Sequence, residues 1–212
     1  MADKQAQCEQ RISGVVLAGG KSTRLGRNKA MERVGADVLI QRVIQRLSQL
    51  TSEVIVVVAS MENAAALNVP PSANVAEDLY LGKGSLGGIF SGISAAKHHH
   101  SLLIACDMPF LNQELLKYMI GLRHDYDVVV PLAEGRPETL HAIYSKNCLE
   151  PIERRLKADD LKIARFFDEV KVRYIKEEEI APFDPDHLSF FNINTQEDLD
   201  QATALEAKAS SR

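Results

Sequence analysis

Several features are scarce or absent in this 212-residue chain, and each absence excludes a class of protein. Its three cysteines, Cys8, Cys106 and Cys148, show neither paired nor metal-ligand spacing, which suits a reducing compartment. No apolar run is long enough to cross a bilayer, and the polar residues 1–11 predict no signal peptide. The net charge is only −4, and lysine and arginine form no block typical of a nucleic-acid surface. We therefore expect a cytoplasmic protein with no membrane and no nucleic acid among its partners.

The composition that remains is that of an ordinary globular protein. Apolar residues make up 45% of the chain, which is enough for a full hydrophobic core at this length. No linker rich in glycine, proline or serine divides the sequence. We expect one domain over residues 1–212, with its core at about 12–199 and polar ends at 1–10 and 209–212.

Short apolar runs alternate with segments of helical spacing, which predicts β-α-β units around a mainly parallel sheet. The expected strands are residues 14–17, 53–59, 74–76, 101–106, 127–131, 140–144 and 171–175. The expected helices are residues 40–50, 86–97, 113–122, 148–156 and 196 to about 208.

The most informative segment is a glycine-containing loop at residues 17–29, which reads Leu-Ala-Gly-Gly-Lys-Ser-Thr-Arg-Leu-Gly-Arg-Asn-Lys. It follows a strand directly. The adjacent Gly19 and Gly20 let backbone N–H groups approach an anion, because no Cβ atom blocks them. Arg24 and Lys29 can neutralise a triphosphate. The loop therefore indicates a nucleotide site; alternatively the glycines form only a tight turn and the two cations are solvated.

Two common phosphate-binding loops do not fit this spacing. A Walker A loop needs a glycine five positions before the Gly-Lys-Ser at residues 20–22, and Val15 stands there. A dinucleotide fingerprint needs G-x-G-x-x-G, whereas the glycines here are Gly19, Gly20 and Gly26.

Two aspartates follow other expected strands. Asp78 comes after residues 74–76, and Asp107 comes after the apolar residues 101–106, in which Cys106 is expected to be buried core. Ligands of open α/β sheets bind beyond the carboxyl ends of the strands, so both aspartates should meet the glycine loop at one sheet edge. Mg²⁺ needs only one or two carboxylates beside phosphate oxygens and water, and Asp107 is our candidate ligand. Alternatively, each aspartate stabilises a turn.

The segment 17–29 resembles the motif L-A-G-G-x-S-x-R-[ML]-G-x-x-K of the molybdenum cofactor guanylyltransferases, within the nucleoside-triphosphate transferase superfamily. The resemblance runs from about residue 12 to about residue 199. It implies a Rossmann-like, three-layer α/β/α fold. Further matching segments are residues 77–78, 84–88, 106–109 and 192–195. In the loop at residues 82–88, Ser85 replaces the family's proline and Gly87 its alanine.

The resemblance also implies roles for individual residues. The expected catalytic residues are Arg24, Lys29 and Asp107, with Asp107 as the Mg²⁺ ligand. Asn192 and Asn194 would lie beside the pterin substrate, although Asn194 could instead cap the last helix. The expected nucleotide-binding residues are Leu17, Ala18, Gly19, Gly20, Lys29, Asp78, Gly84 and Asp107.

Two residues bear on the choice of base. Relatives that use CTP have L-A-A-G where this chain has glycine at Gly19, and the extra methyl would narrow the space for a purine. Asp78 could accept hydrogen bonds from guanine N1–H and N2–H together. Both features favour guanine.

The reaction implied is transfer of GMP from GTP to the terminal phosphate of molybdopterin, with release of pyrophosphate and with Mg²⁺ as cofactor. GTP, molybdopterin and, transiently, molybdopterin-carrying proteins are the expected partners. Alternatives are a cytidylyltransferase or sugar-phosphate nucleotidyltransferase of the same fold, or a non-catalytic nucleotide-binding module.

Overall fold

The computed structural model describes residues 12–19 and 29–210, with side chains as far as residue 208. Within these residues the central sheet has eight strands, ordered β10-β7-β9-β6-β1-β4-β5, with β8 paired to β7. A separate two-stranded sheet pairs β2 with β3. The bounds are β1 Ser13–Leu17, β2 Arg33–Val34, β3 Asp37–Val38, β4 Glu53–Val58, β5 Asn74–Glu77, β6 His100–Ala105, β7 Val128–Ala133, β8 Arg136–Pro137, β9 His141–Ser145 and β10 Val172–Ile175.

Strand β1 lies in the middle of the parallel part of the sheet. It pairs in parallel with β4 on one side and with β6 on the other, and β4 pairs in parallel with β5. Strand β9 runs antiparallel to both of its neighbours, β6 and β7. The chain reverses before β9 at a turn where Glu134 and Gly135 both have positive φ angles, as tight hairpins require. The expected mainly parallel sheet is confirmed, with β8 and β9 as its antiparallel strands.

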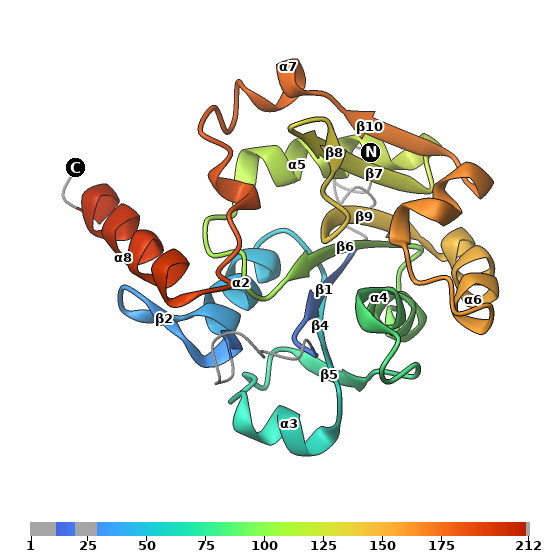
Figure 1. The fold of residues 1–212 in the computed structure, drawn as a ribbon, viewed down its shortest axis with the longest axis horizontal. Helices are drawn as coiled ribbons and strands as arrows, with labels where there is room; N and C mark the ends of the chain where they lie inside the picture. Colours follow the sequence, from blue (N-terminus) through green and yellow to red (C-terminus); the bar gives the residue numbers. More distant parts are fainter. Residues whose placement is uncertain (1–11, 20–28, 211–212) are drawn as a thin grey trace, which may run out of the picture.

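Helices cover both faces of this sheet and make three layers (Figure 1). The helices α2, α3 and α5 pack on one face, and α4 and α6 pack on the other. Their bounds, with those of the peripheral α7 and α8, are α2 Leu39–Ser48, α3 Met61–Ala66, α4 Gly84–Ala95, α5 Gln113–Leu122, α6 Leu149–Lys157, α7 Glu177–Ile180 and α8 Gln196–Ser210. None of the helices that the structure describes combines the length and the apolarity needed to span a bilayer.

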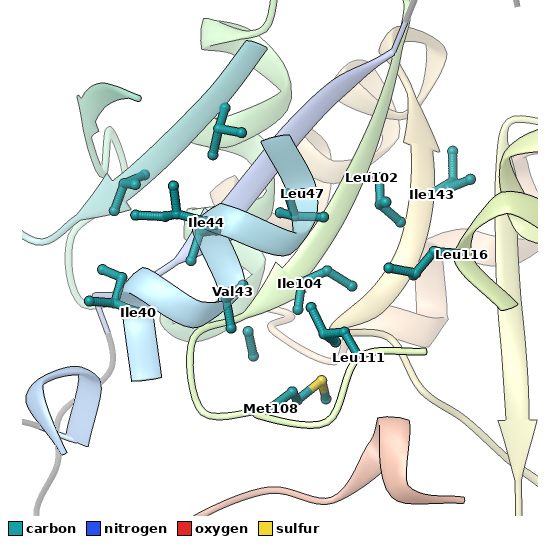
Figure 2. Packing of buried hydrophobic residues seen from close by; sticks show 14 of the residues in the cluster. Ile40, Val43, Ile44, Leu47, Leu102, Ile104, Met108, Leu111, Leu116 and Ile143 are labelled. Atoms are coloured by element: carbon teal, nitrogen blue, oxygen red, sulfur yellow. The ribbon is translucent and has the colours of Figure 1, made fainter. Parts of the chain in front are cut away.

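Successive side chains of the central strands enter two different cores because a strand alternates its faces. Val16 joins the core under α2 and α5, whereas its neighbour Val15 joins the core under α4 and α6. Figure 2 shows the first of these cores, in which Ile44 and Leu47 of α2 pack among buried side chains of the sheet.

Gly92 brings α4 unusually close to the sheet. A Cβ atom at this position would lie 2.4 Å from Cγ1 of Val15, a distance that no real contact allows. The helix can therefore lie directly against β1 only because residue 92 has no side chain. This packing places the beginning of α4 beside the carboxyl end of the central strand.

A third apolar cluster joins distant parts of the chain at the side of the molecule. Val34 of the β2–β3 hairpin and Leu39 pack against Leu199 and Ala202 of α8, with Ile193 between them. The segment before α8 is thereby held near the sheet edge, although the rest of α8 projects away from the sheet (Figure 1). Neither this hairpin nor α3 and α7 is among the elements expected from the sequence.

Candidate active site

A pocket of about 620 Å³ opens beyond the carboxyl ends of β1, β4, β5 and β6. The chain passes from β1 to β4 and β5 on one side of the sheet, and β6 lies on the other side of β1. The pocket therefore lies at the point where the strand order reverses, the usual ligand position in an open α/β sheet.

The structure brings most of the predicted site residues to this pocket. Gly20 and Arg24 lie outside the described residues. The predicted residues that line the pocket are Leu17, Ala18, Gly19, Lys29, Asp78, Gly84, Asp107, Asn192 and Asn194.

The end of β1 is held on both sides by backbone hydrogen bonds. The N–H of Cys106 donates to the carbonyl of Leu17 at 3.1 Å, and the N–H of Ala18 donates to the carbonyl of Val57 at 2.9 Å. Gly19 follows as an exposed residue, and a Cβ atom there would lie 3.4 Å from the backbone N of Ala59. An alanine would therefore fit the fold but would occupy pocket space beside the end of β4.

Lys29 connects the two polar sides of the pocket. Its Nζ donates to Oδ1 of Asn194 at 2.7 Å and lies 3.8 Å from Oδ2 of Asp107. The backbone adds a third connection, because the N–H of Ile193 donates to the carbonyl of Asp107 at 3.0 Å. A cation and a carboxylate thus stand together at the pocket, where a metal-bound phosphate could contact both.

Asp107 carries an incompletely satisfied carboxylate. Its Oδ1 is buried and has no hydrogen-bond partner among the described residues. Burial raises the pKa of this carboxyl, and the nearby Lys29 offsets that rise only in part. A buried oxygen without a donor is a free position for a cation, and Mg²⁺ prefers oxygen ligands. No cluster of three or more His, Cys, Asp or Glu occurs in the described part of the chain, so Asp107 would be a lone anchor beside phosphate oxygens and water.

Asp78 fulfils the turn role that the sequence left open. Its Oδ1 accepts hydrogen bonds from the backbone N–H of Tyr80 at 3.0 Å and from Oγ of Ser91 at 2.9 Å. The residue nevertheless lines the pocket, so one carboxylate oxygen stabilises the turn and the other stays available to a ligand.

The rim loop between β5 and α4 is tied to α6. The hydroxyl of Tyr80 donates to Glu153 at 3.0 Å, and Lys83 forms an ion pair with Asp159 at 2.8 Å. Gly82, which lies between these contacts, and Gly84, which follows them, adopt positive φ angles and line the pocket. The glycines give this rim a shape that other residues rarely adopt.

The two predicted pterin-side asparagines differ in their contacts. Nδ2 of Asn192 donates to the carbonyl of Phe190 at 2.9 Å, whereas the side chain of Asn194 accepts from Lys29. Capping of α8 is done by Thr195, whose Oγ1 accepts from the N–H of Asp198 at 3.2 Å. The alternative role of Asn194 as the helix cap is therefore wrong.

Sequence reasoning missed several pocket residues. Leu81, Ala59 and Leu140 line the pocket. They were missed because their side chains are apolar and belong to no recognisable binding motif. Cys106, expected to be buried core, is half-buried and also lines the pocket. Desolvation raises the pKa of its thiol to about 12, so it stays protonated. Its position at the end of a strand, directly before Asp107, is the signal that could have placed it in the pocket.

Comparisons with known proteins agree with this geometry. The model of the MobA-like NTP transferase domain family matches residues 14–173. The probable molybdenum cofactor guanylyltransferase of Pelotomaculum thermopropionicum is 38% identical over 193 residues, which cover 91% of this chain and 92% of that protein. The molybdenum cofactor guanylyltransferase of Desulfosudis oleivorans is also 38% identical, over 91% of this chain and 95% of its own length.

Comparison with a solved structure points to the same family. The crystal structure of molybdopterin-guanine dinucleotide biosynthesis protein A from Archaeoglobus fulgidus superposes with a TM-score of 0.81 at 29% identity, covering 93% of this chain and all of that one. The expected Rossmann-like α/β fold is thereby confirmed. The chain belongs to the MobA-like NTP transferase family and, within it, to the molybdenum cofactor guanylyltransferases.

Proposed function

We propose that this protein transfers GMP from GTP to the terminal phosphate of molybdopterin and releases pyrophosphate. The observation that carries the proposal is the meeting of Lys29 and the partly unsatisfied Asp107 at a pocket on the switch point of the sheet. The names of the relatives supply the identity of the nucleotide and of the acceptor.

The reaction is a nucleotidyl transfer with balanced bonds. An oxygen of the acceptor phosphate attacks the α-phosphorus, a new P–O bond forms, and the bond from the α-phosphorus to the bridging oxygen breaks. The acceptor oxygen is already anionic, so the step needs no strong general base. Lys29 would stabilise the charge of the phosphates, and we assign the same task to Arg24, which lies outside the described residues.

We further propose that Asp107 holds Mg²⁺. Its buried Oδ1, which lacks a donor among the described residues, offers the oxygen ligand, and the remaining positions would go to phosphate oxygens and water. The bound ion would neutralise charge on the triphosphate and so favour departure of pyrophosphate.

The two substrates would occupy opposite sides of Lys29. We place the guanine near Gly19, Asp78 and Gly84, and the pterin near Asn192 and Asn194, because all five residues line the pocket. Transient contact with molybdopterin-carrying proteins and action in the cytoplasm, where GTP is available, belong to the same proposal.

The test is to incubate the protein with molybdopterin, Mg²⁺ and GTP, CTP, ATP or UTP in turn, followed by mass analysis of the pterin. We expect the guanine dinucleotide from GTP, with pyrophosphate in equal amount. A cytosine dinucleotide would show a cytidylyltransferase instead. Tight GTP binding without release of pyrophosphate would indicate a non-catalytic module.

A further inference from the structure

Ser91 is a polar residue buried inside a helix of the active-site wall. It lies in α4, and only 2% of its surface is exposed. Its Oγ lies within donating distance of two acceptors, Oδ1 of Asp78 at 2.9 Å and the carbonyl oxygen of Gly87 at 2.8 Å. The same Oγ accepts a hydrogen bond from the N–H of Leu79 at 2.9 Å. One hydroxyl proton serves only one acceptor at a time. A carboxylate is a stronger acceptor than a backbone carbonyl, so the Ser91 hydroxyl donates its hydrogen bond to Asp78.

These bonds leave the two oxygens of Asp78 with different tasks. Oδ1 accepts from Ser91 and from the N–H of Tyr80, which fixes the carboxylate at two points. Oδ2 has no hydrogen-bond partner within the described residues, although the side chain lines the pocket. A carboxylate held in this way presents one oxygen in a constant direction, and such preorganisation strengthens recognition of a ligand donor.

Gly87 makes this arrangement possible. A Cβ atom there would lie 2.8 Å from the carbonyl oxygen of Tyr80 and 3.2 Å from Oδ1 of Asp78. The first distance is too short for any real contact, so an alanine would push the turn at residues 78–80 away from α4. The glycine, which stands where the family usually has alanine, therefore lets Asp78 reach Ser91.

We propose that Ser91 is a positioning residue that determines specificity for guanine, acting through Asp78. This inference rests on the proposed function, because it assumes that Asp78 faces the base. The ligand group recognised is the 2-amino group of guanine, which adds a second donor beside N1–H. Without the Ser91 hydroxyl, Asp78 would turn more freely and discriminate less well.

The test compares the dissociation constants of GTP and of inosine triphosphate, which lacks the 2-amino group, by calorimetry in the presence of Mg²⁺. We expect wild type to prefer GTP, and Ser91→Ala to reduce that preference by roughly fivefold, the net size of one ordinary hydrogen bond, because Ser91 acts on the base only through Asp78. In an Asp78→Ala background, Ser91→Ala should change the preference no further, because the residue through which it acts is gone.

Ser145→Ala is the matched control. Ser145 is also a buried serine that donates to an aspartate, with Oγ 2.9 Å from Oδ1 of Asp127, but neither residue lines the pocket. It should lose similar stability and keep the full preference for GTP. If Ser91→Ala folds poorly, Gly87→Ala displaces the same carboxylate by a different route and should also reduce the preference.

Two failures are distinguishable. If wild type and Asp78→Ala bind GTP and inosine triphosphate with the same ratio, the proposed guanine site itself is wrong. If wild type prefers GTP, Asp78→Ala loses that preference and Ser91→Ala keeps it, only the role of Ser91 is overturned.

Discussion

Lys29 donates a hydrogen bond of 2.7 Å to Asn194, although 165 positions separate them in the chain. The contact joins the segment Lys29–Met31 to the segment that precedes α8 at the wall of the pocket. It also explains why α8 matters to the site: Ile193 and Leu199 anchor this segment in an apolar cluster with the β2–β3 hairpin. A residue expected to bind the nucleotide thus also holds a residue expected to bind the second substrate.

We predict that Lys29→Met weakens the binding of both substrates. The methionine keeps the apolar stem but removes the charge beside the phosphates and the donor to Asn194. GTP should bind about tenfold more weakly, the size of one lost charge-assisted contact, and KM for molybdopterin should rise. Calorimetry and steady-state kinetics measure the two effects. Lys117→Met is the control, since this exposed lysine pairs with Glu114 and does not line the pocket. An unchanged GTP affinity would contradict the role of Lys29.

Replacing Asp107 should separate catalysis from stability. Asp107→Asn keeps the shape of the side chain but removes the negative charge that we assign to Mg²⁺ binding. Turnover should fall by at least about 100-fold, and GTP binding should lose its dependence on Mg²⁺. The Tm of the free protein should hardly fall, because the lost pairing with Lys29 at 3.8 Å is offset by removal of a buried negative charge. Pyrophosphate release and thermal unfolding measure the two quantities, and a fully active variant would overturn the metal assignment.

Much of the site could be predicted because its signals are local. Gly19, Asp78 and Asp107 each follow a strand of the parallel part of the sheet, and parallel strands bring their carboxyl ends to one edge. The placement of Val15 and Val16 in two different cores is likewise a local effect, because successive side chains of a strand point to opposite faces.

The parts that escaped prediction depend on contacts between distant segments. The side chain of Asn194 points to Lys29 and not to the helix behind it because Thr195 already caps α8. The antiparallel direction of β9 depends on a turn at Glu134 and Gly135 that has none of the strongest hairpin pairs. Ser91 resembles any helical serine in the sequence, and its bond to Asp78 exists only once α4 lies on the sheet.

Gly19→Ala tests the origin of base choice. The added methyl would lie 3.4 Å from the backbone N of Ala59, which the fold tolerates, but it would occupy space on the wall of the pocket. We expect the preference for GTP over CTP to fall by roughly tenfold, which is the lower end of the effect of one added carbon in a closely fitting pocket. Competition binding measures the ratio. Gly121→Ala, in a helix away from the pocket, controls for the substitution, and an unchanged ratio in Gly19→Ala would remove this residue from base selection.

Two helical glycines should respond to alanine with opposite signs. At Gly92 the new Cβ would meet Val15 at 2.4 Å, so Gly92→Ala should destabilise the protein by about 1–3 kcal/mol. At the exposed Gly121 nothing lies within 4 Å, and the better helix propensity of alanine should stabilise the protein by about 0.5–1 kcal/mol. Urea unfolding gives both values. Equal effects at the two positions would contradict the close packing of α4 on β1.

His141 should make the protein sensitive to acid. The residue is fully buried beside Phe190, and neither ring nitrogen has a partner of hydrogen-bond geometry among the described residues. Burial lowers its pKa from 6.5 to about 3, and a weaker interaction with the Ser189 backbone opposes that change only in part. Below pH 6.5, therefore, His141 is protonated in the unfolded chain but stays neutral in the native protein. Stability should fall as the pH drops from about 6.5 towards 3, by about 1.4 kcal/mol per pH unit.

Urea unfolding between pH 7 and pH 5 tests this dependence. Over that interval wild type should lose about 2 kcal/mol through His141, most of it below pH 6.5. His141→Leu cannot take up the proton in either state, so its stability should depend less on pH, and at neutral pH it should at least equal wild type because two unpaired buried nitrogens are gone. His99→Gln alters an exposed histidine just before the start of β6 and should leave the acid sensitivity in place. If His141→Leu and wild type lose stability in parallel, the acid sensitivity originates in other groups and His141 is already satisfied in the fold.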